Sequence, residues 1–278
     1  MKKTDRIAIQ GIKGAFHEEA ARKLFGQQIE IVECLEFQDE IKALDSGLAD
    51  YAVMAIENTI SGTILNNYEL IRRSGVSIIG ETTIQIRQHL GGVQGASLGD
   101  LREVKSHYMA LNQCRDFFQR YPQIKLVESQ DTALSIKNVA LENLKTSAAI
   151  GSELAIKEYG LELIAKDLQT NNSNYTRFGV LQLNKYQDVG NKLSLSIILK
   201  HESGTLAKTL NKLHQLHVNL TKIESVPIVG EPFRYRFYLD LIIPDEDSFE
   251  KTIEAITPLT DELKVLGRYK SEPLKTTS

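Results

Sequence analysis

The run NYTRFGVL at residues 174–181 sets three chemically different groups at the mouth of an apolar stretch. Asn174 offers an amide, Thr176 a hydroxyl, and Arg177 a fixed cation whose planar fork matches a carboxylate. On a strand, Thr176 and Arg177 point to opposite faces, whereas Asn174 and Thr176 share one face. A turn over residues 174–176, which the preceding TNNSNY favours, would bring the hydroxyl and the cation together instead. The sequence is compatible with both arrangements, and also with a plain polar loop that places Arg177 in a surface ion pair.

Other polar residues collect where the predicted strands end. Glu57, Asn58 and Thr59 follow the apolar run YAVMAI, and Ser106 and Asp131 lie at the ends of later apolar runs. Ligands of open α/β sheets bind beyond the carboxyl ends of the strands, where the N–H groups of the following helices attract anions. The pattern therefore predicts a site for a small anionic metabolite. Asn58 or Asp131 could equally be an N-cap. A carboxylate that follows a buried run, as Glu57 does, is either buried, held in an ion pair or part of a functional site.

Several other chemistries lack the residues they need. Ser106 and His107 are adjacent, so on a strand they point apart, and the sequence has no GxSxG elbow, which argues against a Ser-His hydrolase. The glycines Gly11 and Gly14 form neither a dinucleotide fingerprint nor a P-loop and fit a tight turn between a strand and a helix. The sequence has no CxxC or HExxH spacing, so we expect no metal site.

Composition and charge narrow the class further. The chain of 278 residues is 42% hydrophobic and 25% charged, which is typical of a globular protein of two or three domains. A net charge of −3 without long runs of one sign argues against nucleic acid or a membrane surface as a partner. No stretch has the length of a membrane span, and the two distant cysteines, Cys34 and Cys114, predict a cytoplasmic location.

The elements predict an α/β fold. Over the first ~185 residues short apolar runs alternate with helical patterns, which indicates parallel βαβ units. The extended IIGETTIQIRQHL at 78–90 has no helix after it and is expected to cross between two lobes. From residue 193 the order becomes βαββαβ, a ferredoxin-like unit, and its first strand, LSLSIIL, alternates leucine with serine and is expected to be half-buried. The polar NKYQDVGN at 184–191 is the predicted boundary.

Taken together, these motifs resemble those of prephenate dehydratases with a C-terminal ACT regulatory domain. The catalytic motifs GIKGAFHEEAA, AIENTISGTI, VKSHYMALNQC and NYTRFGVL are similar to G-x-x-G-[ST]-[FY]-S, P-[IV]-E-N-S-x-x-G, S-H-P-x-A-L-x-Q-C and N-x-T-R-F-x-x-L. HESGTLAKTL and NLTKIESVP resemble the G-A-L-A region and the N-L-T-x-I-E-S-R-P of ACT domains. The resemblance covers nearly the whole chain, with the motifs in order.

The resemblance implies dehydration and decarboxylation of prephenate to phenylpyruvate in phenylalanine biosynthesis, with feedback regulation by L-phenylalanine at ACT–ACT interfaces of a homodimer or homotetramer. It implies a two-lobed catalytic region similar to periplasmic binding proteins, with substrate between the lobes. The reaction that it implies needs no cofactor. The expected domains are a catalytic region at 1–188 (one lobe from about 1–80 with 166–188, the other from 81–165), an ACT domain at 189–271 and a disordered tail at 272–278.

The resemblance also assigns roles to individual residues. Catalysis would fall to Thr176, Glu57 and Asn58, and substrate binding to Arg177, Ser106, Gln113, Thr59 and Asn174. Thr176 would hydrogen-bond the departing hydroxyl or relay a proton to it, and Arg177 would hold the pyruvyl carboxylate. Glu57 could be the ultimate acid only if burial favoured its protonated form. The effector site would comprise Ser203, Gly204, Thr205, Leu206, Asn219, Leu220 and Glu224.

The chain departs from the family pattern at a few positions. Thr59 and His17 stand where serine is usual, HYM replaces HPQ after Ser106, and Val226 replaces an arginine near the effector site. Two alternative functions fit the same motifs or the same cleft. One is arogenate dehydration, in which an amino group replaces the keto oxygen of the substrate, and the other is a non-catalytic protein that senses an amino acid.

Overall fold

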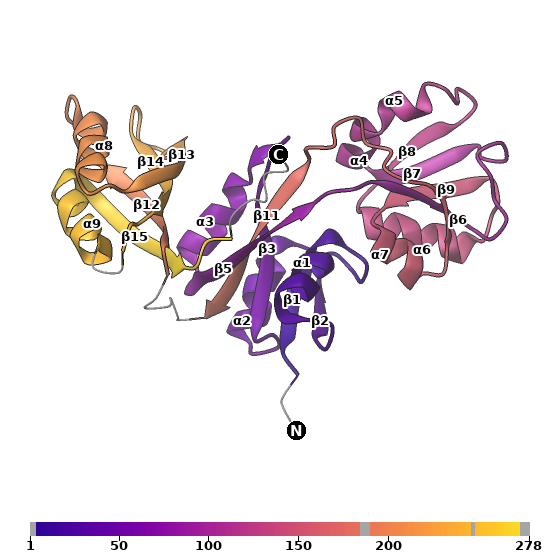
Figure 1. Ribbon diagram of the computed structural model, residues 1–278, viewed down its shortest axis with the longest axis horizontal. Coiled ribbons are helices and arrows are strands. Elements are labelled where there is room, and N and C mark those ends of the chain that lie inside the picture. Colours follow the sequence, from indigo (N-terminus) through magenta and orange to yellow (C-terminus); the bar gives the residue numbers. More distant parts are fainter. Residues whose placement is uncertain (1–3, 184–189, 246–247, 273–278) are drawn as a thin grey trace. The chain divides into compact units, whose positions relative to one another are not determined.

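A computed structural model describes residues 4–183, 190–245 and 248–272 (Figure 1). Most of the predicted boundary at 184–191 and of the predicted tail at 272–278 lies outside the described residues. The chain divides into two compact units, one made of residues 1–62 and 83–178 and the other of 63–82 and 179–278. Within the described residues, no helix is long and apolar enough to cross a membrane.

The first unit begins with a parallel βαβαβ arrangement. Strand β1 (Arg6–Gln10) pairs in parallel with β2 (Glu30–Cys34) on one side and with β3 (Tyr51–Asn58) on the other. Helices α1 (Phe16–Phe25) and α2 (Phe37–Asp45) make the connections. In β3 the residues from 52 to 56 are all buried, as expected of a strand that is covered on both faces.

The turn between β1 and α1 needs its glycines, as predicted. Gly14 has φ +88°, and a Cβ at this position would lie 2.6 Å from the Cα of Ala155. The N–H of Gly14 donates to the buried carboxylate of Glu18 at 2.6 Å, and Arg22 pairs with the same carboxylate at 2.6 Å. The start of α1, where an anion is favoured, is therefore occupied by a side chain of the helix itself.

Two strands extend this sheet to the order β2-β1-β3-β11-β5, with β4 (Gly62–Thr63) paired to β3. Strand β5 (Val76–Gln85) and strand β11 (Tyr175–Leu183) each run from one unit into the other. After β5 the chain continues without a helix into β6 (His89–Gly92), which belongs to a second sheet. The extended segment at 78–90 thus joins two sheets, as the sequence predicted.

The second sheet has five strands in the order β10-β6-β9-β7-β8. Its remaining strands are β7 (Glu103–His107), β8 (Lys125–Ser129), β9 (Ser147–Gly151) and β10 (Glu162–Ala165), and its helices are α4 (Tyr108–Gln113), α5 (Arg115–Phe118), α6 (Thr132–Glu142) and α7 (Glu153–Glu158). Strand β7 runs parallel to β8 and β9, whereas β6 and β10 are antiparallel, so the purely parallel prediction is wrong here. Asp131 caps α6 by accepting the N–H of Leu134 at 2.9 Å.

The second unit contains α3 (Leu65–Arg73) and a ferredoxin-like βαββαβ arrangement, as predicted. The antiparallel sheet has the order β13-β14-β12-β15. Its elements are β12 (Lys192–Leu199), α8 (Thr205–Gln215), β13 (Asn219–Pro227), β14 (Tyr235–Ile242), α9 (Ser248–Ile256), a 3-10 turn (Thr257–Leu259) and β15 (Thr260–Tyr269).

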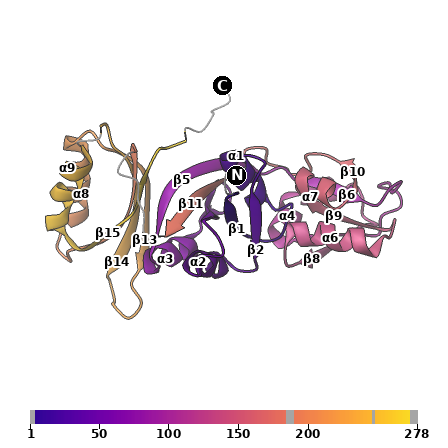
Figure 2. The same ribbon diagram turned by 90° about the horizontal axis from the view of Figure 1, so that it is seen from below.

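Both faces of this sheet are covered, which corrects the prediction of a half-buried first strand. Helices α8 and α9 pack on one face and α3 lies on the other (Figures 1 and 2). All eight residues of β12 are buried, and Ser194 and Ser196 are completely inaccessible. On the face toward α3, Asp240 accepts from Ser194 at 2.6 Å and from Tyr68 at 3.4 Å. The serines of LSLSIIL therefore meet a polar helix instead of water.

A buried acid in α2 yields a prediction about stability. Glu40 is 0% exposed, and burial raises the pKa of its carboxyl well above the usual value, against a weaker opposing effect of the Gln10 backbone. The protonated form thus stabilises the fold fully below the unfolded value of about 4.3, and this contribution is lost as pH rises, by at most about 1.4 kcal/mol per pH unit. Glu40→Gln cannot ionise. We therefore expect the unfolding free energy of the variant, relative to that of the wild type, to increase between about pH 5 and pH 8.

Urea unfolding at both pH values measures this difference. The exposed Glu158→Gln serves as the control for exchanging a glutamate for glutamine. If Glu40→Gln kept a constant difference across the range, the buried acid would not be titrating as argued.

Candidate active site

Four polar side chains form a continuous hydrogen-bonded network where β3 ends and β11 begins. The Nδ2 of Asn58 donates to the Oδ1 of Asn174 at 2.8 Å and to the Oγ1 of Thr176 at 2.9 Å. The Nδ2 of Asn174 donates in turn to the Oε1 of Gln113, the last residue of α4, at 3.0 Å. Asn174 is completely buried and Thr176 nearly so. The network therefore joins a helix of the five-stranded sheet to two strands of the other sheet.

The orientation of the Asn58 amide is fixed by the backbone that follows it. Its Oδ1 accepts the N–H groups of Ile60 and Ser61, each at 2.9 Å. Because backbone N–H groups only donate, the other end of the amide must be the NH₂ group that faces Thr176. Asn58 thus caps this turn rather than a helix.

This orientation decides what the Thr176 hydroxyl can do. Its oxygen accepts from Asn58, so its own proton is directed elsewhere. Among the described residues no hydrogen-bond acceptor for that proton is found. An accepted hydrogen bond polarises the hydroxyl and strengthens it as a donor. Thr176 is therefore a polarised donor whose proton is not taken up by another described residue.

Thr59 holds the start of β11 against the end of β3. Its N–H donates to the carbonyl of Tyr175 at 2.9 Å, and its hydroxyl accepts the N–H of Tyr175 at 2.9 Å. The same hydroxyl donates to the carbonyl of Ser173 at 2.8 Å. With its proton used in this way, Thr59 positions the segment that carries Asn174.

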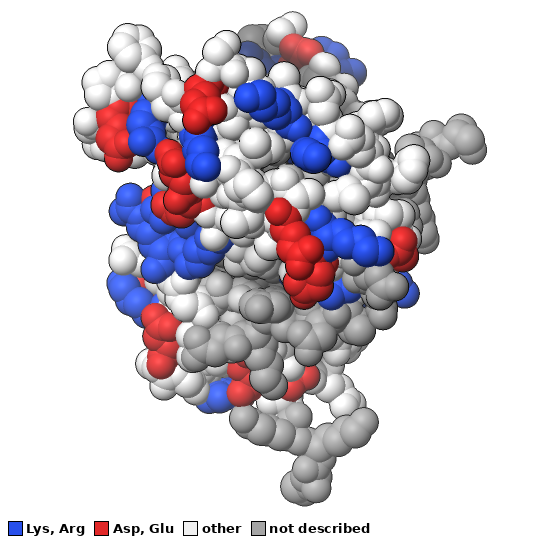
Figure 3. All heavy atoms as spheres, turned by 90° about the vertical axis from the view of Figure 1, so that its left-hand side faces the viewer, with Lys and Arg blue, Asp and Glu red and all other residues white. Residues whose placement is uncertain are grey.

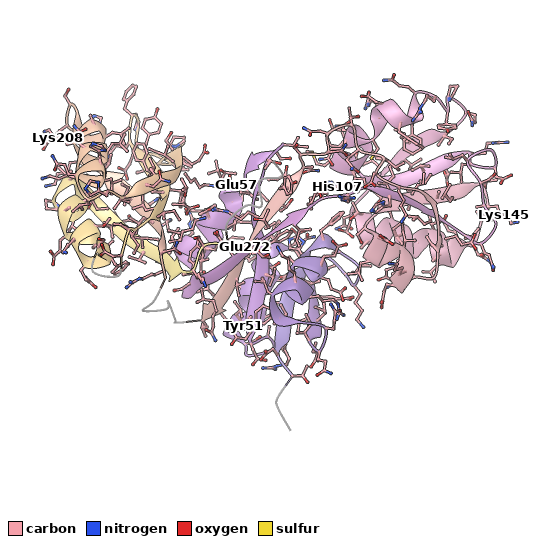
Figure 4. The ribbon with its side chains drawn as sticks, viewed as in Figure 1. Tyr51, Glu57, His107, Lys145, Lys208 and Glu272 are labelled. Carbon is pink, nitrogen blue, oxygen red and sulfur yellow. The ribbon has the colours of Figure 1, made fainter. Side chains whose placement is uncertain are left out.

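Arg177 and Glu57 form an ion pair. Strand β11 already includes Tyr175, so Thr176 and Arg177 alternate along it, and the alternative of a turn over residues 174–176 is wrong. The Arg177 guanidinium lies 3.3 Å from a carboxylate oxygen of Glu57, and the two side chains are 15% and 40% exposed. Burial, the condition under which Glu57 would be the acid, is therefore not met. Figure 4 labels Glu57 and His107 among the side chains.

The structure does not join Ser106 to the network by a hydrogen bond in the described part of the chain. Ser106 is completely buried, and its hydroxyl donates to the carbonyl of Ile150 at 2.8 Å. His107 is exposed and caps α4, with its Nδ1 accepting the N–H of Met109 at 3.3 Å. The two neighbours thus serve different elements, in agreement with the argument against a Ser-His pair.

His17 stands where serine is usual in the family, and it packs against two aromatic rings. Its ring makes an edge contact with Phe178, at 5.0 Å between centroids, and lies 5.7 Å from the ring of Phe37. Phe178 follows Thr176 on the same face of β11. Burial lowers the pKa of His17 to about 3, so the ring is neutral at ordinary pH. An aromatic residue at this position was the only sequence signal for this packing.

A pocket in the second unit overlaps the predicted effector site in part. Its volume is about 330 Å³, and it lies between the end of β12, the start of α8 and the β13–β14 hairpin. Ser203, Thr205 and Leu206 line it, but Asn219, Leu220 and Glu224 do not. Gly204, at φ +79°, begins α8 in the left-handed conformation. The sequence analysis missed the lining residues Leu199, Lys200, His201, Glu202, Phe233, Arg234, Tyr235 and Phe237.

Glu224 instead faces the segment that precedes α3. Thr63 accepts from the Nζ of Lys222 at 2.7 Å and donates to the carboxylate of Glu224 at 3.4 Å. The Lys222 ammonium also lies over the ring of Tyr68, 4.5 Å from its centroid.

Figure 3 shows one side of the molecule, where acidic and basic side chains are interspersed. Among the described residues, no group of His, Cys, Asp and Glu side chains could hold a metal ion.

The two α/β sheets, the ferredoxin-like sheet and the polar network define a class of two-sheet α/β protein with an added βαββαβ domain. Residues 7–186 match the family described as prephenate dehydratase. The chain therefore belongs to the prephenate dehydratase family. It is 36% identical over 285 residues to arogenate dehydratase/prephenate dehydratase 2 of Arabidopsis thaliana, covering 98% of this chain and 74% of the relative.

Several solved structures are similar over nearly the whole chain, among them the following two. GqqA, described as a novel type of quorum-quenching acylase, has a TM-score of 0.87 at 25% identity, covering 97% of this chain and 99% of its own. The prephenate dehydratase of Arthrobacter aurescens in complex with L-Phe has a TM-score of 0.83 at 24% identity, covering 95% of this chain and 89% of its own. The second likeness concerns the fold alone.

The buried His17 ring gives a prediction about acid sensitivity. A lowered folded pKa means that the unfolded state binds the extra proton, so stability is lost as pH falls from about 6.5 toward 3. We expect ¹⁵N shifts of the His17 ring to remain those of a neutral imidazole from about pH 8 to pH 4. We expect His17→Gln to lose less stability than the wild type over the same range. A ring that became protonated near pH 6 would contradict the buried placement.

Proposed function

We propose that this protein is a lyase that converts prephenate to phenylpyruvate by loss of water and CO₂. Membership of the prephenate dehydratase family supports the reaction class. The observation that carries the mechanism is the hydrogen bond from the Asn58 amide to the Thr176 hydroxyl, at 2.9 Å. It leaves the threonine proton available to a leaving oxygen.

The chemistry requires such a donor. Prephenate carries a ring hydroxyl opposite a ring carboxylate, and formation of the aromatic ring drives the reaction. The barrier arises because hydroxide is a poor leaving group, and a donor aimed at the departing oxygen contributes roughly 10²–10⁴-fold. A threonine hydroxyl is too weak an acid to give up its proton unaided. Thr176 therefore hydrogen-bonds the oxygen as charge develops on it, or relays a proton, while Asn58 supports the threonine oxygen.

The neutral groups of the network suit a reaction that expels CO₂. Asn58, Asn174 and Gln113 can orient a substrate without adding charge. A cation placed on the ring carboxylate would stabilise the ground state and slow decarboxylation. We therefore place the cationic contact at the other end of the substrate, on the pyruvyl carboxylate.

We propose that Arg177 makes this contact by exchanging Glu57 for the substrate. The Arg177–Glu57 separation of 3.3 Å is longer than the 2.7–2.9 Å of a tight charge-assisted bond, and Glu57 is 40% exposed. Arg177 could thus bind a carboxylate without breaking a strong buried pair. Ser106, with its hydroxyl donated to Ile150, would support the site from the neighbouring sheet rather than donate to the substrate.

Acyl transfer, the activity described for one structural neighbour, has no comparable support. Ser106 and His107 do not pair, since each is committed to a different partner. Arogenate is a closer alternative, because a relative carries both dehydratase names. Assays with prephenate and with arogenate, following phenylpyruvate absorbance and phenylalanine formation, decide between them. Turnover of neither substrate would favour a binding protein.

We further propose that residues 1–188 form the catalytic region, in two lobes as expected from the sequence, and that 189–271 form an ACT domain that binds L-phenylalanine. The βαββαβ order, the GTLAK turn at the start of α8 and the adjacent pocket support this assignment. A homodimer or homotetramer would complete the effector site with a second copy. Cys34 and Cys114 are free and buried, which supports a reducing, cytoplasmic location.

Replacing Thr176 tests the catalytic role. We expect Thr176→Ala to lower kcat with prephenate at least tenfold, while Thr176→Ser, which keeps the hydroxyl, retains most of it. Circular dichroism and the urea midpoint show whether the fold is intact. An alanine variant with wild-type kcat would remove Thr176 from the mechanism.

Arg177→Lys tests the carboxylate contact. Because lysine lacks the planar fork, we expect KM for prephenate to rise while kcat changes little. Glu57→Gln provides the contrast, since weakening the competing partner should leave KM unchanged or lower it. A rise in KM for both variants would indicate that the pair only holds β3 against β11.

Calorimetry with L-phenylalanine tests the effector proposal. We expect binding to the wild type at millimolar concentration or below, with loss of binding in Leu206→Glu, which places a carboxylate in the apolar part of the pocket. Lys208→Met, on the exposed side of α8, is the control and should bind normally. Sedimentation with and without the amino acid reports the oligomeric state.

A further inference from the structure

A buried ion pair in the second unit has no role in the site described so far. The Nζ of Lys192 lies 3.0 and 2.9 Å from the two carboxylate oxygens of Glu81, and the side chains are 8% and 2% exposed. The N–H of Glu272 also donates to this carboxylate, at 3.3 Å. Apolar residues of similar volume are often at least as stabilising as a buried ion pair, so stability is a weak explanation for one.

The pair fixes β5 to the ferredoxin-like sheet. Lys192 is the first residue of β12, and Glu81 lies on β5 one residue before the crossing between the units at Thr82–Thr83. A second contact lies three residues away, where a Cβ on Gly267 would come within 2.1 Å of the carbonyl oxygen of Ile78. Two close contacts on one strand determine its position along its axis.

The other end of β5 holds the segment that carries Asn174. The side chain of Gln85 donates to the carbonyl of Asn172 at 2.8 Å, and the N–H of Ile86 donates to the carbonyl of Asn174 at 2.8 Å. Five residues of extended chain, about 17 Å at 3.3 Å each, separate Glu81 from Ile86. An axial shift of β5 would therefore act on the backbone of Asn174.

We propose that Glu81 and Lys192 are positioning residues for the candidate active site. Their ion pair sets the register of β5, which holds Asn174 where its amide meets Asn58 and Gln113. The pair thereby fixes the direction in which Thr176 offers its proton. This inference rests on the proposed function and adds to it.

The test separates positioning from stability. The variant Glu81→Leu/Lys192→Met removes both charges and keeps the volume, and Lys192→Arg keeps the pair. Lys105→Met is the control, because Lys105 on β7 forms a 2.7 Å ion pair with Glu142 at the end of α6, away from β5. Three quantities are measured: the urea midpoint, kcat and KM with prephenate, and hydrogen exchange of the Ile86 amide.

In the double variant we expect at least tenfold faster exchange at Ile86 and at least fivefold lower kcat, with KM within twofold of wild type. Exchange in β1 should not change, and Lys192→Arg and Lys105→Met should behave as wild type. Ile86 exchange at the wild-type rate in the double variant would overturn the inference. Should that variant fail to fold, Glu81→Gln is assessed by the same criteria. A wild type that did not turn over prephenate would refute the proposed function, and Ile86 exchange would still decide the inference.

Discussion

The orientation of one amide, that of Asn58, determines what the candidate active site can do. Two backbone N–H groups hold its oxygen, and the opposite end must then donate to Asn174 and to Thr176. Were the amide reversed, the threonine would have to give its proton to the asparagine oxygen and could offer none to a ligand. A turn of ordinary backbone thus converts a weakly acidic hydroxyl into a directed donor.

Much of the surrounding structure keeps this arrangement in place. Thr59 ties the start of β11 to the end of β3, and Gln113 anchors Asn174 from a helix of the other sheet. The Ile86 amide holds the Asn174 backbone from β5. Each of these contacts uses a neutral donor or acceptor, so neutral groups alone order this network. Arg177 carries the cation of this region and pairs with Glu57 at 3.3 Å.

The second unit uses buried polarity for a different purpose. The sheet face toward α3 carries Asp240, Ser194 and Tyr238 rather than aliphatic residues, and each has a partner. Tyr238 donates to Glu69, whose pKa is lowered to about 2, chiefly by Arg72. Hydrogen bonds and ion pairs specify one register between two elements more sharply than apolar contacts do, at some cost in stability. Such a face suits a domain that must stay in fixed register with the helix that follows the active-site segment.

The sequence alone determined the elements, their order and most of the chemically relevant residues. Period-two and helical patterns depend on near neighbours in the chain, so the βαββαβ order, the glycine turn at Gly14 and the cap at Asp131 could be predicted. Tertiary structure alone decided which residues meet. Asn58 and Asn174 are 116 residues apart, and Glu81 and Lys192 are 111 apart. The burial of Ser194 depends on what packs against its face of the strand. Local patterns carry no information about a partner so distant in the chain.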